Sequence, residues 1–170
     1  MTSNKVIELL NQQINKEFYS AYLYFDFANY YTEQGLNGFA NWFHVQSQEE
    51  RDHALLFTQY MQNNSLKVTF ETIENPTKTY SSTMEPLKDG LAHEIFITES
   101  INTIYDEAYT SKDFRTMQFL DWFVREQGEE EKNSTDLIRK MELFGNESKS
   151  LYMLDQELAG RLYNPPTLVL

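Results

Sequence analysis

Cysteine is absent from this sequence of 170 residues. Its absence excludes disulfides, thiolate metal sites and a cysteine nucleophile. Basic residues are also few, because 14 Lys and Arg stand against 26 Asp and Glu, and the formal net charge is -12. An acidic surface argues against direct nucleic-acid binding, which needs a basic face, and it is compatible with a cationic partner.

Long apolar runs are missing as well. No segment approaches the roughly 20 apolar residues of a membrane span, and the N-terminus from Met1 to Phe18 lacks the apolar run of a signal peptide. We therefore expect a cytoplasmic protein that does not enter a membrane. Glycine-rich phosphate loops and a Gly-x-Ser-x-Gly nucleophile motif are also absent, so neither chemistry is indicated.

Apolar residues are plentiful although they do not form long runs. They make up 41% of the chain, and 12 Phe and 11 Tyr supply large side chains for a core. A chain of this length can form a core that needs neither disulfides nor metal for folding. We expect a single folded domain that spans residues 1–170.

Helical periodicity predicts an all-α protein with four long helices and a short fifth. The expected helices lie before residue 34 and at about 39–64, 82–110, 114–145 and 147–159. The third is predicted to begin at Ser82, because Ser82 and Glu85 have capping-box spacing and Pro86 falls in the first turn.

The second and third helices are separated by about 20 residues without helical periodicity, a length that is unusual inside a compact domain. A four-helix bundle with a long crossover needs such a connection. A helix of about 26 residues is about 39 Å long, and about 20 extended residues reach roughly 66 Å. The predicted fold is therefore a four-helix bundle in which the first pair and the second pair of helices are antiparallel hairpins.

Each long helix carries one carboxylate near the middle of its apolar seam, namely Glu17, Glu50, Glu94 and Glu130. Antiparallel pairing brings these four residues into one layer of the core. Burial without partners would cost several kcal/mol for each ion, and no stripe of Lys or Arg is available to compensate. Two divalent cations would balance the four charges, with His53 as a neutral nitrogen ligand three residues after Glu50.

No single helix carries this prediction, because a lone Glu is usually solvated and Glu-x-x-His is a common pattern. A carboxylate that interrupts the apolar seam at a compatible level in all four helices is far less frequent by chance. Glu50 is the expected bridge between two ions, with Glu17 and His53 completing one shell and Glu94 and Glu130 the other. Carboxylates with one imidazole suit iron or manganese better than copper, and the absence of thiolate disfavours structural zinc.

Two further residues stand close enough to the expected ions to take part in chemistry. Gln127 lies one turn before Glu130 and can hydrogen-bond a bound oxygen species without adding charge. Tyr24 lies two turns after Glu17 and is placed to hydrogen-bond a ligand or to supply an electron. Two Fe(II) ions bridged by a carboxylate could deliver electrons to O2 at this position.

The motifs NKEFYSAYLY, QEERDHALLF, GLAHE and LDWFVREQGEEE together make the chain resemble the non-haem bacterial ferritins over essentially its whole length. The resemblance implies a ferritin-like domain and the same ligand sets for two irons. It further implies a third iron site formed by Glu49, Glu126 and Glu129 with Glu130. It also implies a homo-oligomeric shell of twenty-four subunits that stores ferric mineral, with Fe(II) and O2 or hydrogen peroxide as substrates.

Departures from related families refine this expectation. Bacterioferritins and di-iron bundle enzymes usually carry a second Glu-x-x-His where this chain has Gln127 and Glu130, which favours iron passing through the site over a permanently held cofactor. Asp52 occupies the position of the haem-ligating Met of bacterioferritins, so no haem is expected.

Three functions are consistent with these features. The leading hypothesis is a ferroxidase that oxidises Fe(II) and deposits the ferric product inside a cage. A passive storage shell is disfavoured, since it would have no reason to bury the carboxylates. A di-iron oxygenase calls for the missing second Glu-x-x-His and for an apolar pocket beside the metals.

Overall fold

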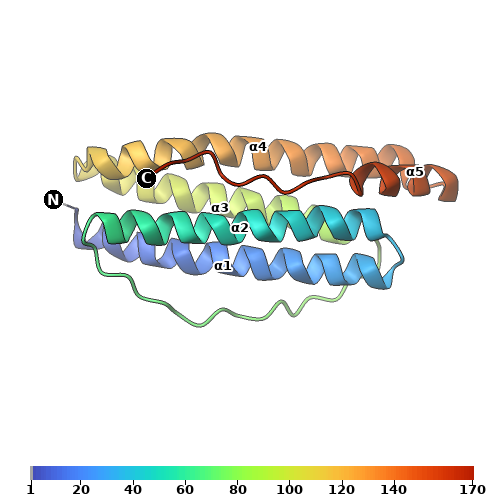
Figure 1. Ribbon diagram of the computed structural model, residues 1–170, viewed down its shortest axis with the longest axis horizontal. Coiled ribbons are helices and arrows are strands. Elements are labelled where there is room, and N and C mark those ends of the chain that lie inside the picture. The colour runs from blue at the N-terminus through green and yellow to red at the C-terminus, as the bar shows by residue number, and fades with distance from the viewer. Residues whose placement is uncertain (1) are drawn as a thin grey trace.

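The computed structural model of the protein describes residues 2–170 and is built from five α-helices (Figure 1). No strand occurs among the described residues. The helices are α1 (Asn4–Glu33), α2 (Asn37–Asn63), α3 (Glu85–Thr110), α4 (Phe114–Phe144) and α5 (Ser148–Leu158). The predicted all-α bundle with a short fifth helix is confirmed.

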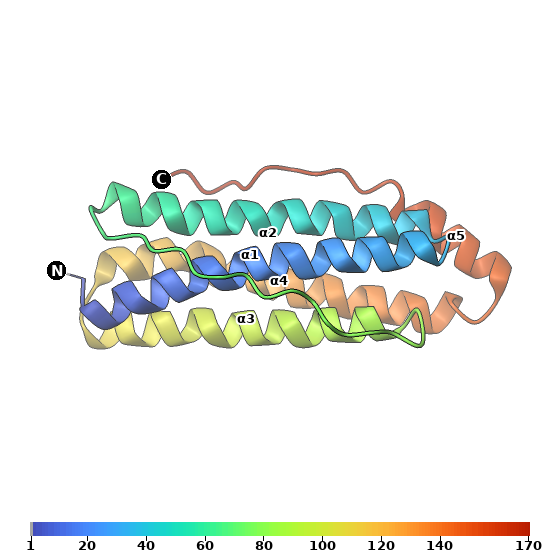
Figure 2. The same ribbon diagram turned by 90° about the horizontal axis from the view of Figure 1, so that it is seen from below.

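The four long helices lie side by side, and α1 pairs mainly with α2 while α3 pairs mainly with α4 (Figures 1 and 2). Short turns join the helices of each pair, which makes both pairs antiparallel hairpins. The long connection between α2 and α3 then travels from one end of the bundle to the other (Figure 2). None of the helices within residues 2–170 combines the length and apolarity that a membrane crossing requires.

The crossover is fastened to α1 by side-chain amides. Asn11 donates to the carbonyl of Lys67 at 3.0 Å and accepts from the backbone N–H of Thr69 at 2.7 Å. Asn15 donates to the carbonyl of Thr72 at 3.0 Å. These bonds satisfy backbone groups of a segment that has no secondary structure of its own.

The start of α3 differs from the prediction. The helix begins at Glu85 instead of Ser82, and its N-cap residue Met84 makes no side-chain capping bond. The carboxylate of Glu85 instead accepts from the backbone N–H and the hydroxyl of Ser81, at 2.8 and 2.6 Å. The Ser82–Glu85 capping box is therefore wrong, whereas the placement of Pro86 in the first turn is confirmed.

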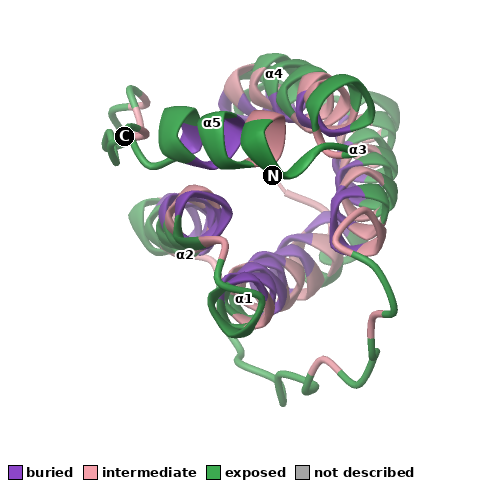
Figure 3. Ribbon diagram, turned by 90° about the vertical axis from the view of Figure 1, so that its right-hand side faces the viewer, coloured by how far each residue is buried: buried purple, intermediate pink, exposed green. Residues whose placement is uncertain are grey.

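The apolar core is divided into two clusters. One contains Leu10 and Ile14 of α1 with Phe123 of α4, and the other contains Tyr24 of α1 with Phe43 of α2. The buried residues of all four long helices face the space between them (Figure 3). The polar mid-helix positions lie between the two clusters, which is the arrangement that the interrupted seams predict.

The short helix α5 caps the start of α2, which has no capping side chain of its own. Oδ1 of buried Asp155 accepts from the backbone N–H groups of Gly38 and Phe39, at 2.8 and 3.0 Å. A negative group at a helix N-terminus satisfies orphan donors and interacts favourably with the helix dipole. Gly38 allows this approach, since a Cβ there would lie 1.6 Å from the carbonyl oxygen of Asp155.

The close approach of α5 to α2 predicts opposite effects for two glycine substitutions. Gly38→Ala should lower the free energy of unfolding by about 2–3 kcal/mol, because the added methyl group displaces α5 and its cap. Gly128→Ala in α4 should raise it by about 1 kcal/mol, because a Cβ there meets no atom within 4 Å and Ala favours a helix. Urea unfolding followed by circular dichroism checks both, and equal effects of the two substitutions would contradict the packing described.

Candidate metal centre

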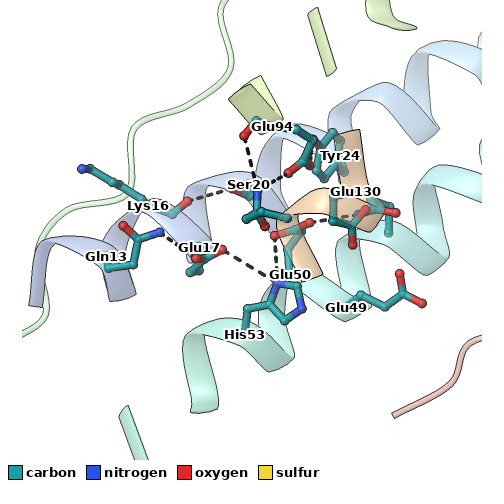
Figure 4. Close-up of polar contacts among 12 residues, drawn as sticks. Gln13, Lys16, Glu17, Ser20, Tyr24, Glu49, Glu50, His53, Glu94 and Glu130 are labelled. Carbon is teal, nitrogen blue, oxygen red and sulfur yellow. Dashed lines mark hydrogen bonds and ion pairs between the residues drawn. The ribbon is translucent and has the colours of Figure 1, made fainter. Parts of the chain in front are cut away.

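Two groups of three metal-ligand side chains lie at the middle of the bundle and share one residue. Ligand atoms of Glu17, Glu50 and His53 lie within 4.8 Å of one another, and so do those of Glu50, Glu94 and Glu130. The five side chains come from all four long helices and point toward one another (Figure 4). They are only 0–4% exposed, so the cluster is enclosed by the bundle. Glu50 lies where a bridge between two cations would have to lie.

Three neutral amides hold the carboxylates in place. Gln13 donates to Oε1 of Glu17 at 2.7 Å. Nε2 of Gln46 donates to Glu50 at 3.0 Å and to Glu130 at 2.8 Å. Amides supply hydrogen-bond donors without adding charge, so they orient the carboxylates and leave the negative charge of the layer intact.

The third amide belongs to Gln127, whose Nε2 donates to Oε2 of Glu94 at 3.1 Å and to the Glu94 carbonyl at 3.3 Å. The hydroxyl of Tyr24 donates to the other carboxylate oxygen of Glu94. Gln127 and Tyr24 thus both reach the cluster through the same carboxylate. Their predicted proximity to the ligands is matched, and a role in chemistry stays a prediction.

Two buried polar atoms of the cluster have no hydrogen-bond partner, namely Oε2 of Glu17 and Nδ1 of His53. They lie 4.0 Å apart, and Nδ1 is 3.4 Å from Oε2 of Glu50. Buried polar atoms are almost always paired, so two adjacent exceptions need an explanation. A cation between them would satisfy both atoms, and this donor set therefore fits a metal ion.

Burial and mutual repulsion change the protonation of the layer. Burial, together with the charge of Glu50, raises the pKa of Glu17 and that of Glu94 to about 8. Burial and the charges of Glu94 and Glu50 likewise raise the pKa of Glu130 well above its ordinary value. Without cations, three of the four carboxylates therefore tend to retain protons at neutral pH.

The Glu50 and His53 side chains behave as a pair. Burial opposes both charges, but the contact with His53 outweighs it and lowers the pKa of Glu50. Burial alone would lower the pKa of His53, and the neighbouring carboxylates, Glu50 first, raise that pKa to about 10. An arriving cation therefore has to displace protons from the layer before it is coordinated.

The third set predicted from the resemblance, Glu49, Glu126 and Glu129, is arranged differently. These residues line one pocket of about 430 Å³ beside the cluster. They do not form a group of three ligands, since within residues 2–170 only the two groups above meet the 4.8 Å distance. The carboxylate of Glu49 is instead bound by Arg161, with Nη2 and Oε2 separated by 2.6 Å. Their role as a metal site stays a prediction.

Sequence reasoning missed Gln13, Gln46 and Arg161 as parts of the site. Gln46 stands in the polar middle of the α2 seam and Gln13 lies one turn before Glu17, so the spacing pattern contained a signal for both. Arg161 lies beyond the last helix, in a segment without periodicity, and its position could not be found from spacing.

Known proteins resemble this chain over nearly its whole length. A family model described as Ferritin-like domain matches residues 7–144. A bacterial non-heme ferritin of Campylobacter jejuni is 36% identical, covering 92% of this chain and 93% of that protein. A bacterial non-heme ferritin of Staphylococcus epidermidis is 34% identical, covering 96% of this chain and 99% of that protein.

Solved structures give the same result for the fold. A closed form of the Archaeoglobus fulgidus ferritin, engineered by mutagenesis, superposes with a TM-score of 0.93 at 38% identity, covering 96% of this chain and 100% of that one. An open-pore ferritin from the same archaeon superposes with a TM-score of 0.92 at 39% identity, covering 94% of this chain and 98% of that one.

The raised pKa values predict how the metal-free protein responds to pH. Between the ordinary carboxylate value of 4.5 and about 8, the native state binds protons at Glu17 and Glu94 that the unfolded state has released. The free energy of unfolding should therefore fall as the pH rises through this window. Above pH 6.5, the raised pKa of His53 also lowers the free energy of unfolding as the pH rises. The lowered pKa of Glu50 keeps that residue ionised across the window.

Thermal unfolding midpoints in the presence of a chelator, measured across this pH range, check the effect. Glu17→Gln should flatten the dependence of the midpoint on pH, whereas Glu99→Gln on the exposed side of α3 should leave it unchanged. A midpoint that rises steadily with pH in the parent protein would contradict the protonation described.

Proposed function

The chain belongs to the ferritin-like domain family, and from this membership we propose that it is an iron-storage protein that oxidises Fe(II) at the buried cluster. One observation carries the proposal beyond the family: two buried three-ligand groups share Glu50 at mid-bundle. A storage subunit without oxidation chemistry would not need this costly layer.

Each ligand has a distinct place in the proposed reaction. Glu17 and His53 hold the first Fe(II), Glu94 and Glu130 hold the second, and Glu50 bridges the two. The unpaired atoms of Glu17 and His53 face the first position, which supports this division. Iron is a substrate here, so the ligands have to bind it and then let it go.

The proposed reaction is a two-electron oxidation. Each of two Fe(II) ions loses one electron, and one O2 takes up both electrons with two protons and leaves as hydrogen peroxide. Peroxide can replace O2 as the oxidant, accepting two electrons and two protons to form two waters. Binding of the two irons releases protons from Glu17, Glu94 and Glu130 to solvent, and the two protons that the oxidant takes up are drawn from solvent in turn.

Gln127 and Tyr24 act through Glu94 in this proposal. Both donate hydrogen bonds to its carboxylate, so they set the direction in which it meets the second iron. An amide at position 127 binds iron more weakly than a carboxylate or imidazole would. The oxidised iron can then leave toward a third position near Glu49, Glu126 and Glu129, and onward to the mineral in a cage of twenty-four subunits.

The oxygenase alternative needs room for an organic substrate beside the metals. The pocket of about 430 Å³ beside the cluster is lined by Glu49, Glu126 and Glu129, which does not suit an apolar substrate. The apolar pocket that adjoins Tyr24 and Gln46 holds about 10 Å³. Such a volume accommodates about one water molecule at most. The described geometry therefore favours small inorganic substrates, namely Fe(II) and O2 or peroxide.

Removal of the bridge should abolish rapid oxidation. Glu50→Ala takes a ligand from both irons, and the initial rate of ferric absorbance after O2 is admitted to about two Fe(II) per chain should fall more than about tenfold. Glu99→Ala, an exposed glutamate on α3, is the matched control and should oxidise iron at the parent rate. Parent-like oxidation by Glu50→Ala would contradict the proposed centre.

Storage in a cage makes a separate prediction about size. Light scattering of the purified protein should give a particle of roughly 480 kDa, from 24 chains of 20.1 kDa. A stable monomer or dimer would contradict the storage function whatever the oxidation rate.

A further inference from the structure

The segment after α5, residues 161–170, turns back and runs along α2 toward the opposite end of the bundle (Figures 1 and 2). We name it the C-terminal strap. Tyr163 donates to Asp52 of α2, and Nε1 of Trp122 on α4 donates to Thr167 at 3.1 Å. Leu168 packs against the apolar cluster around Phe123. The strap is thus fastened to both helices that form the walls of the acidic pocket.

Arg161, the first residue of the strap, inserts its guanidinium between α2 side chains. Cζ lies 4.1 Å from the centre of the Trp42 ring, and Nη1 donates to the Trp42 carbonyl at 3.1 Å. Nη2 donates to Oε2 of Glu49 at 2.6 Å, with both side chains only 20% exposed. Asn41 holds the Arg161 carbonyl at 3.0 Å. A stacked and multiply bonded guanidinium of this kind is held far more firmly than an exposed ion pair.

The same guanidinium reaches the metal cluster through one amide. Nη1 of Arg161 also donates to Oε1 of Gln46 at 2.9 Å. Nε2 of Gln46 then donates to Glu50 and Glu130, at 3.0 and 2.8 Å. Arg161 therefore touches both the acidic pocket and the residue that orients the bridging carboxylate.

We propose that Arg161 is a built-in counter-cation of the acidic pocket, and that a third metal ion gains Glu49 as a ligand only by displacing this guanidinium. The proposal rests on the proposed function, since it concerns the iron that leaves the buried centre. The strap then acts as a gate, because occupation of the pocket releases Arg161 from Glu49. The third site fills late, after the two buried positions.

Three features of the pocket support the displacement. Glu49, Glu126 and Glu129 line it together, yet Glu49 is bound to Arg161 and lies to one side of the buried carboxylates (Figure 4). Arg161 itself lines the pocket, so its ion pair with Glu49 lies inside the space that a cation would enter. Arg125 also lines the pocket, but only Arg161 forms an ion pair with one of its carboxylates among the described residues.

Titration of the full-length apo protein with Zn2+, a redox-inert probe, tests the competition by calorimetry. The parent should show two tight ions per chain and a weaker third. Arg161→Gln should bind the third ion roughly tenfold more tightly, a difference of about 1.4 kcal/mol, and Arg161→Lys should fall between the two. Arg139→Gln makes the same change of charge at an ion pair that is 69% exposed at the arginine, and it should leave the third affinity unchanged.

Other outcomes of the titration would overturn the proposal. An unchanged or weaker third site in Arg161→Gln would show that the guanidinium does not compete with metal. Weakening of the two tight sites alone would make Arg161 a positioning residue for Gln46. Absence of the two tight sites from the parent would instead contradict the proposed function. The comparison of Arg161→Gln with Arg139→Gln would still show whether the guanidinium competes with a metal ion for Glu49.

Fluorescence of Trp42 gives a second, independent measure of displacement. The emission of the parent should change as the third Zn2+ binds, because the guanidinium leaves the indole ring. The change should be much smaller in Arg161→Gln and in Trp42→Phe, which retains only Trp122, the tryptophan that lines the pocket. Constant Trp42 emission while the third site fills would show that Arg161 stays in place, contrary to the proposal.

Discussion

The repulsion among four carboxylates buried at one level of the bundle is the constraint on which the rest of the structure depends. An isolated four-helix bundle would gain stability from apolar residues at Glu17, Glu50, Glu94 and Glu130. The chain instead places an apolar cluster on each side of the layer, so the helices are held together above and below it. The clusters supply the stability, and the layer supplies a donor set that fits cations.

Neutral amides stabilise this layer by hydrogen bonds and add no positive charge to it. Gln13, Gln46 and Gln127 each donate to a carboxylate, and Tyr24 donates to the second oxygen of Glu94. Positive side chains there would relieve the repulsion and block the metals. Burial and the charge of Glu50 raise the pKa of Glu17 and that of Glu94, which favours protons in that role in the metal-free state. In the proposed function, loading iron exchanges these protons for metal ions.

The segments outside the four long helices adjust the site from a distance. The helix α5 caps α2 through Asp155, and α2 carries Gln46, Glu49, Glu50 and His53 on consecutive turns. The strap that follows α5 returns to the same helix and places Arg161 against Glu49. The C-terminal part of the chain thus caps the ligand-bearing helix and supplies the cation that pairs with Glu49 in the acidic pocket.

Local periodicity by itself determined the four long helices, the crossover and the layer of Glu17, Glu50, His53, Glu94 and Glu130, because residues three or four apart share a helix face whatever surrounds them. The family resemblance rested on the same motifs. Only the tertiary structure decided that α3 begins at Glu85, that Asp155 caps α2, and that Glu49 forms an ion pair with Arg161. The last two contacts join residues more than 100 positions apart, through segments that have no repeating pattern. Spacing along the sequence carries no information about such contacts, since they depend on how the packed helices place the irregular segments around them.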